Sequence, residues 1–292
     1  MLRSVAIYSK ESNQKTTEGV SRLIREFSQR GIKIFQHQKH TLDSGSIEAG
    51  RPVRFNDLES LPDLPDMILS VGGDGTFLET MLKVRKHGIP IAGVNTGRMG
   101  FLANIPDDEI GHSIDLLCQG EYEIIERSLL EIRSPADLFN NESSTALNEI
   151  TVQKADPSMI IINVFVDNIY LNTYWADGLI ISTATGSTAY NLSVGGPILS
   201  PEDESIIISP ISPHNLTIRP IVISGESELR MTIEGRADAY LATCDFRSRR
   251  LSFDQAINIA RSPEKLKTVM LRKRDFYSTL RNRLMWGADK RN

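Results

Sequence analysis

A single carboxylate, Asp74, lies within the glycine-rich stretch VGGDGT at residues 71–76, directly after the apolar run DMILS. Gly72, Gly73 and Gly75 carry no side chains, so backbone N–H groups can approach phosphate oxygens there, and the helical pattern that follows adds partial positive charge. An acid among phosphate-binding glycines repels the anion unless it has its own task. Two tasks suit it, namely accepting a proton from an attacking hydroxyl and touching a metal ion held by the phosphates.

The stretch matches neither of two common phosphate motifs. The chain has no Walker GxxxxGK[ST] sequence, and the glycines do not follow the dinucleotide pattern GxGxxG. Taken alone, Gly-Gly-Asp-Gly is also the composition of an ordinary β-turn, because both residue types are favoured in turns. We assign Gly72, Gly73, Gly75 and Thr76 to a phosphate loop, with the simple turn as the alternative.

A second stretch, ADGLIISTATGSTAYNLSVGGPI at 176–198, reads as a strand followed by a loop rich in small hydroxyls. Tyr190 and the pair Gly195-Gly196 follow the hydroxyls. Short donors and one aromatic face suit the sugar, phosphate and base of a nucleotide, although a plain Ser/Thr-rich connection is the alternative. The hydroxyl residues are Ser182, Thr183, Thr185, Ser187, Thr188 and Ser193.

Two shorter pieces carry further candidates. GVNTGRMGFL at 93–102 places Gly97 and Gly100 after a strand, where they let the backbone approach a ligand closely. ALNEIT at 146–151 places Asn148 and Glu149 at the start of a β run, and an exposed surface pair is the alternative there.

The elements that must position these residues alternate between strand and helix up to about residue 120. Val20, Leu23, Ile24 and Phe27 show the spacing of an amphipathic helix. We therefore predict an α/β domain with a parallel sheet. Its predicted strands are 4–9, 32–36, 66–71 and 89–95, its predicted helices are 17–30, 76–87 and 106–120, and 41–60 is predicted to be loop.

Beyond residue 121 short β runs follow one another with little helical spacing, which predicts an all-β domain. We expect a phosphate-loop domain at 1–120 and a β-rich dinucleotide-binding domain at 121–258. The rest, 259–292, is expected to be a helical tail that packs back on the first domain, with helical spacing over 275–287. A small-molecule site is expected in the cleft between the two domains.

Composition excludes several classes of function. A hydrophobic content of 40%, a charged content of 24% and a net charge of −4 are those of a soluble globular protein and argue against nucleic acid as the main partner. Cys118 and Cys244 have no metal-ligand spacing and indicate a reducing compartment. Without a signal peptide or an apolar run of about 18 residues, the chain is expected to be cytoplasmic and to have no membrane partner.

Taken together, GGDGT, GVNTGRMGFL, ALNEI, the 176–198 stretch, ISPHNLTIRPIVI and LRNRLMWG resemble the bacterial NAD kinase family, in that family's order. GGDGT alone is shared with diacylglycerol and sphingosine kinases, and TATGSTAYNLSVGGPI is the discriminating element. The resemblance implies transfer of the γ-phosphoryl group of ATP to the 2′-hydroxyl of the adenosine ribose of NAD, giving NADP. It also implies Mg²⁺ arriving with ATP, no protein-bound metal and a homodimer or homotetramer. A lipid kinase and a non-catalytic NAD(P) sensor are the alternatives.

The resemblance also implies roles for individual residues. Asp74 orients and deprotonates the ribose hydroxyl, Asn148 and Glu149 contact the riboses and amide, and Asp177 faces the nicotinamide carboxamide. Tyr190 is the stacking surface at the adenine end. The expected NAD-binding set is Asp74, Gly75, Asn148, Glu149, Asp177, Thr188, Ala189, Tyr190, Asn191 and Ser193.

One departure from the family concerns Asp245-Phe246-Arg247, where many members have Asp-Gly. The bulky residue is expected to reshape one wall of the dinucleotide pocket, so no site residue is assigned there.

Overall fold

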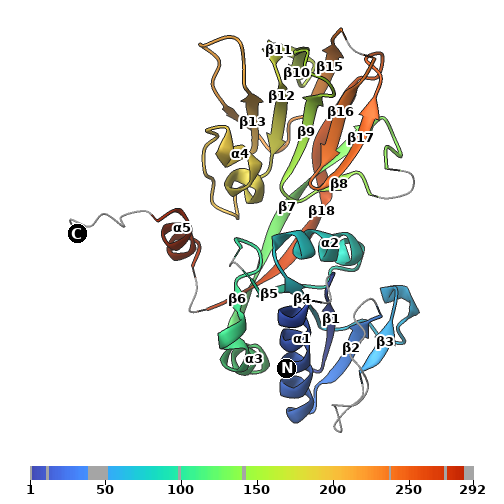
Figure 1. Ribbon diagram of the computed structural model, residues 1–292, viewed down its shortest axis with the longest axis vertical. Helices are drawn as coiled ribbons and strands as arrows, with labels where there is room; N and C mark the ends of the chain where they lie inside the picture. Colours follow the sequence, from blue (N-terminus) through green and yellow to red (C-terminus); the bar gives the residue numbers. More distant parts are fainter. Residues whose placement is uncertain are drawn as a thin grey trace, which may run out of the picture. The chain divides into compact units, whose positions relative to one another are not determined.

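The computed structural model describes residues 2–10, 13–38, 52–97, 100–139, 143–236, 238–272 and 275–285 (Figure 1). The chain forms two compact units, one made of residues 1–126 and 266–292 and the other of residues 127–265. It leaves the first unit within β7 (Tyr122–Ser134) and returns within β18 (Ile257–Leu271). The division therefore falls within continuous strands, and it lies a few residues beyond the boundary expected from the change in sequence pattern.

The first unit is built on a parallel sheet, as the sequence predicts. Its strands lie in the order β5-β4-β1-β2-β3, and every neighbouring pair is parallel. Short β6 (Ile105–Pro106) and the end of β18 also pair with β5. Strand β3 lies in a region predicted to be loop, because three residues give too short a pattern to detect. The five strands are β1 (Ser4–Tyr8), β2 (Lys33–His37), β3 (Val53–Phe55), β4 (Met67–Gly72) and β5 (Ile91–Asn95).

Helices cover both faces of this sheet. Strand residues such as Ile7 and Leu69 pack in one apolar cluster with α1 (Gln14–Gln29) and α3 (Ile110–Gln119). Side chains alternate along a strand, so the neighbouring Ser70 faces the other way and accepts a hydrogen bond from Thr80 of α2 (Asp74–Val84). Predicted helix ends are confirmed by the left-handed Gly88, which follows a 3₁₀ turn, and Gly120.

The second unit is mostly antiparallel, as predicted. One sheet has the order β14-β13-β12-β9-β16-β17, a second layer has the order β11-β10-β15-β18, and their facing side chains form a common apolar core. The strands of the first sheet are β14 (Ile221–Ile223), β13 (Ile206–Ile211), β12 (Gly178–Ser182), β9 (Glu149–Lys154), β16 (Tyr240–Cys244) and β17 (Arg247–Leu251). The second layer adds β11 (Ile169–Ala176), β10 (Ile160–Val166) and β15 (Leu229–Glu234), and β8 (Thr145–Ala146) pairs with β7.

The prediction of a helical tail over 259–292 is wrong for its first part. Residues 259–271 belong to the 15-residue strand β18, in which buried residues such as Ile257, Ile259 and Leu266 are interspersed with charged ones. The basic residues of this stretch interrupt the apolar pattern from which a strand is predicted. Helix α5 (Phe276–Leu284) does lie in the segment with helical spacing, and the side chain of Asp275 caps it by accepting from the N–H of Ser278 at 2.8 Å. In the described part of the chain, no helix is long and apolar enough to cross a membrane.

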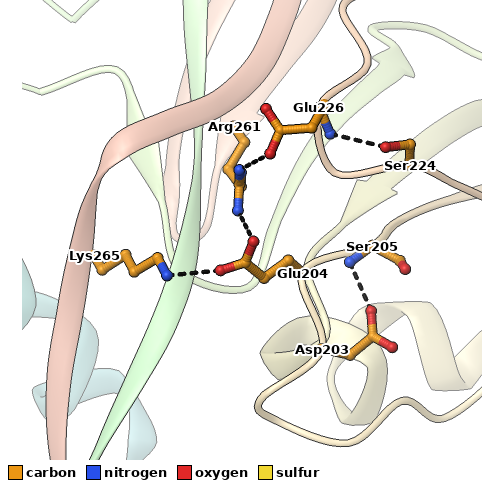
Figure 2. Close-up of polar contacts among 7 residues, drawn as sticks. All are labelled: Asp203, Glu204, Ser205, Ser224, Glu226, Arg261 and Lys265. Atoms are coloured by element: carbon orange, nitrogen blue, oxygen red, sulfur yellow. Dashed lines mark hydrogen bonds and ion pairs between the residues drawn. The ribbon is translucent and has the colours of Figure 1, made fainter.

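A network of ion pairs fixes the segment that leads into β13 (Figure 2). Arg261 of β18 pairs with both Glu204 and Glu226, and Lys265 pairs with Glu204 at 2.6 Å. A Cβ atom on Gly225 would come within 2.0 Å of the Glu204 carbonyl oxygen, so only glycine fits there. The segment after the predicted nucleotide loop is thereby held against the sheet of the second unit.

Candidate functional site

The glycine-rich stretch lies at the point of the first unit where the order of strand connections reverses. Strand β1 leads to β2 on one side, whereas its neighbour β4 leads to β5 on the other. In open α/β sheets, ligands bind outside the carboxyl ends of the strands at such a point. Gly72 ends β4, Gly73 is the N-cap of α2, and Asp74 is the first helical residue. The fold therefore supports a ligand site at this stretch on grounds independent of the motif.

The Asp74 carboxylate is held in place by three backbone N–H groups. Its Oδ2 accepts from Phe101 at 2.9 Å, and its Oδ1 accepts from Leu102 at 3.1 Å and Ala103 at 3.0 Å. A carboxylate has about four lone-pair positions, so one position is left for a further donor. The group is thus oriented before any substrate arrives.

Gly100 makes this arrangement possible. A Cβ atom at residue 100 would lie 1.7 Å from Oδ1 of Asp74. The sequence predicts a close approach of this glycine to a ligand, and the structure shows instead a close approach to Asp74. Sequence reasoning missed the contact because the two residues belong to separate motifs.

The three glycines around the start of α2 differ in the space that surrounds them. Gly72 has a φ of +152°, and a Cβ there would meet Oγ1 of Thr76 at 2.4 Å. Gly73 and Gly75 are exposed, and a Cβ on either would have no heavy atom within 4 Å. These two positions leave open surface at the N-terminal end of a helix, where anions are stabilised.

In the second unit, several predicted residues follow one strand. Strands β9 and β12 are paired so that Ser182 faces Glu149 and Gly178 faces Gln153. Asp177 therefore lies at the opposite end of β9 from Glu149, about 17 Å away at the usual rise of a strand. Tyr190 bridges this interval, since its N–H donates to the Glu149 carboxylate and Gln153 Nε2 donates to its hydroxyl at 3.3 Å.

Glu149 is a buried acid whose pKa lies above its ordinary value. It is 8% exposed, and its Oε2 has no hydrogen-bond partner in the part of the chain that the structure describes. Burial and the nearby Asp245 raise the pKa of Glu149 to about 8, against the opposing effect of the Tyr190 N–H. Burial also raises the pKa of Asp245, but three N–H groups and the charge of Arg247 oppose it. Burial and the charge of Asp245 therefore both favour the protonated form of Glu149.

This charge state predicts a pH-dependent stability. The folded pKa of Glu149 lies above the unfolded value of 4.5, so its stabilising effect is complete below pH 4.5 and is lost as pH rises through about 8. Wild type should lose up to about 1.4 kcal/mol of unfolding free energy per pH unit in this window, whereas Glu149→Gln should not. Urea denaturation at several pH values measures the difference. The control is Glu202→Gln at an exposed acid, and equal pH slopes in wild type and Glu149→Gln would contradict the assignment.

The departure at Asp245-Phe246-Arg247 has a structural explanation. Asp245 and Phe246 connect β16 to β17, which begins at Arg247, and the positive φ of 52° falls on Asp245 and not on Phe246, so no glycine is needed at 246. Asp245 accepts from the N–H groups of Leu147 at 2.9 Å and Asn148 at 2.8 Å. The Phe246 side chain is 48% exposed. Asp245 thus positions the Asn-Glu pair, a role that the sequence analysis did not assign.

Asn148 combines a fixed backbone with a free side chain. Its carbonyl oxygen accepts from the Thr183 N–H at 2.9 Å and from the hydroxyls of Thr183 and Ser182. A Cβ atom on Gly186 would lie 2.1 Å from the same oxygen. The side-chain amide is half-buried and has no partner among the described residues. It remains available to a ligand.

Asn191, which is predicted to contact NAD, has a side chain that already forms hydrogen bonds within the fold. Its side chain is fully buried, and its amide donates to the carbonyls of Ser187 and Pro197 while its oxygen accepts from the Ser209 hydroxyl at 2.6 Å. A Cβ atom on Gly196 would reach the same amide at 2.0 Å. Asn191 holds the loop together, because every polar atom of its side chain is already used.

The hydroxyl loop is more ordered than predicted. Residues Thr185–Thr188 form a 3₁₀ turn and Tyr190–Ser193 a short helix, α4. Thr188 donates to the Thr185 carbonyl and Ser193 to the Tyr190 carbonyl, so these hydroxyls can offer a ligand only acceptor positions. Ala189 is half-buried, and Tyr190 is 38% exposed. The roles of these four residues stay predictions.

Asp177 has an internal partner that the sequence did not reveal. Lys154 Nζ lies 2.7 Å from its Oδ1, and both side chains are about one-third exposed. The Lys154 N–H also donates to the Asp177 carbonyl at 2.9 Å. A ligand amide at Asp177 would therefore meet a carboxylate that is already paired with a cation.

Comparison with known proteins covers nearly the whole chain. The family profile described as "ATP-NAD kinase N-terminal domain" matches residues 8–122, and "ATP-NAD kinase C-terminal domain" matches residues 147–271. An NAD kinase of Flavobacterium psychrophilum is 39% identical over 293 residues, covering 99% of both chains. An NAD kinase of Bacteroides fragilis is 44% identical over 227 residues, covering 77% of this chain and 78% of the other.

Two solved structures share the fold. An NAD kinase from Archaeoglobus fulgidus in complex with ATP superposes with a TM-score of 0.73 at 26% identity, covering 95% of this chain and 98% of the other. Yeast NADH kinase complexed with NADH superposes with a TM-score of 0.84 at 21% identity, covering 99% and 89%. At that lower identity the likeness is one of fold.

Proposed function

Because this chain belongs to the ATP-NAD kinase family, we infer that it is an NAD kinase that phosphorylates NAD with ATP to give NADP. Relatives named NAD kinase that match almost the full chain carry this inference. The structural observation that supports it most directly is the position of Asp74 at the point of the sheet where the order of strand connections reverses. The reaction belongs to phosphoryl transfer, in which positioning and charge stabilisation provide most of the catalysis.

We propose that Asp74 acts on the 2′-hydroxyl of the adenosine ribose. The bond from the ribose oxygen to the γ-phosphorus forms while the bond to the leaving ADP oxygen breaks, and the hydroxyl proton passes to Asp74. The remaining lone-pair position of its carboxylate supports this role, because three N–H groups fix the direction of that position. The exposed Gly73 and Gly75 leave space for phosphate oxygens at the helix end.

The second unit is proposed to hold the dinucleotide. A protonated Glu149 can donate a hydrogen bond as well as accept one, the free amide of Asn148 does the same, and Tyr190 offers a ring for stacking. Mg²⁺ enters as part of the ATP substrate. Among the described residues no cluster of three or more His, Cys, Asp or Glu side chains could hold a metal ion alone.

One assay tests the function against its alternatives. Purified protein receives ATP and Mg²⁺ with NAD, NADH or diacylglycerol vesicles, and NADP or NADPH is detected by a coupled dehydrogenase. We expect NADP from NAD. Phosphorylation of diacylglycerol alone would support the lipid kinase, and NAD binding without product would support a sensor. Either outcome would overturn the proposed function.

We also propose that the protein forms a homodimer or homotetramer. Strand β11 lies at the edge of its layer and exposes Ile169, Tyr170 and Trp175, which are 73%, 55% and 49% exposed. Large apolar side chains along a sheet edge are typical of an interface between copies. The mass of the native protein in solution tests this, and a monomer would contradict it.

A further inference from the structure

Helix α5 of the first unit carries an arginine whose charge is not satisfied by its surroundings. Arg283 is half-buried, and its Nε and Nη2 atoms are buried and have no hydrogen-bond partner among the described residues. A buried guanidinium N–H without an acceptor carries a full desolvation penalty. Such a group is retained at a cost in stability unless something binds to it.

The surroundings of Arg283 belong to the Asp74 site. Its guanidinium carbon lies 5.9 Å from the centre of the Phe101 ring, and the Phe101 N–H is one of the three that hold the Asp74 carboxylate. Burial lowers the pKa of Arg283, and the negative charge of Asp74 opposes this effect. No ion pair joins the two side chains, so Arg283 lies within electrostatic reach of Asp74 without being neutralised by it.

We propose that Arg283 binds the triphosphate of the ATP donor and faces the phosphoryl group transferred next to Asp74. This inference rests on the proposed function and extends it to a residue that the sequence analysis left unassigned. A guanidinium presents a planar fork of N–H donors that matches phosphate oxygens, and a cation beside the transferred group stabilises the charge that develops there. A triphosphate would supply the acceptors that Nε and Nη2 lack.

The competing explanation is purely structural, with the Arg283 side chain anchoring α5 on Phe101. Arg283→Met keeps the apolar stem over the ring and removes only the charge and its donors. Arg281, two residues earlier on the same helix and exposed, gives the matched control Arg281→Met. Arg283→Lys tests whether a point charge replaces the fork.

Steady-state kinetics with varied ATP and varied NAD separate the two explanations. We expect Arg283→Met to raise KM for ATP about 10-fold and lower kcat, with KM for NAD and the melting temperature close to wild type. Arg283→Lys should recover part of this loss. The control Arg281→Met should behave like wild type. An unchanged KM for ATP in Arg283→Met, or equal losses for both substrates, would overturn the proposal.

Calorimetric binding of a non-hydrolysable ATP analogue with Mg²⁺ gives a readout that does not depend on NAD turnover. Wild type should bind it about 10-fold more tightly than Arg283→Met does. If wild type makes no NADP, the proposed function fails, while this difference in binding still decides the role of Arg283. Equal affinities would overturn it in either case.

Discussion

Asp74→Asn is expected to lower kcat for NADP formation at least about 100-fold, because general-base help contributes about 10²–10⁴ in rate. The amide keeps the size of the side chain but removes its charge and its ability to take the hydroxyl proton. One of its two polar atoms becomes a donor, which then faces an N–H group of residues 101–103. NAD should still bind, since most of the proposed dinucleotide contacts lie in the second unit.

The stability of Asp74→Asn must be measured beside its rate. Losing one charge-assisted hydrogen bond costs about 1.5–3 kcal/mol of stability, so the melting temperature of Asp74→Asn should fall as well. Kinetics at a temperature where the variant is folded, with NAD binding measured by calorimetry, separate the two effects. Asp63→Asn removes a well-exposed acid of the same unit and is the control. A near-normal kcat for Asp74→Asn in the folded state would refute the assignment of Asp74.

The fold could be predicted from the sequence where its patterns were local. The α1 stripe of Val20, Leu23, Ile24 and Phe27 and the stops at Gly88 and Gly120 depend on neighbouring residues, and the structure confirms them. Strand β18 could not be predicted in this way. Its charged residues do not follow a strand pattern, because the strand is stabilised by pairing with β5 and β15, which lie far away in the chain.

The candidate site divides in the same way. The sequence could single out Asp74, Asn148 and Glu149 by residue type, but it could not show what holds them. Asp245 fixes the backbone of residues 147–149 from 96 or more positions away. Asn191 shows the reverse case, because a polar residue within a suggestive motif has its side-chain hydrogen bonds satisfied inside the fold. Satisfied hydrogen bonds decide which polar residues remain available, and only the structure counts them.

The position of the Asp74 carboxylate can be tested without changing its charge. Gly100→Ala leaves Asp74 intact but places a methyl group where Oδ1 now lies, at 1.7 Å. The carboxylate is the end of a side chain and can move, so we expect it to swing away and lose its bonds to residues 101–103. Because a misplacement of about 1 Å can cost 10²-fold in rate, kcat should fall about 100-fold.

Gly97→Ala provides the matched control, since a Cβ at residue 97 of the same loop would have no heavy atom within 4 Å. Both glycines lack the positive φ that would strain alanine, so the two variants differ mainly in the collision with Asp74. We expect Gly97→Ala to keep kcat within a few-fold of wild type. If Gly100→Ala is equally active and folded, the carboxylate can work from a different position, and its three N–H bonds do not orient it for the reaction. A loss shared by both variants would place the defect in the loop itself and would also count against the role of Asp74.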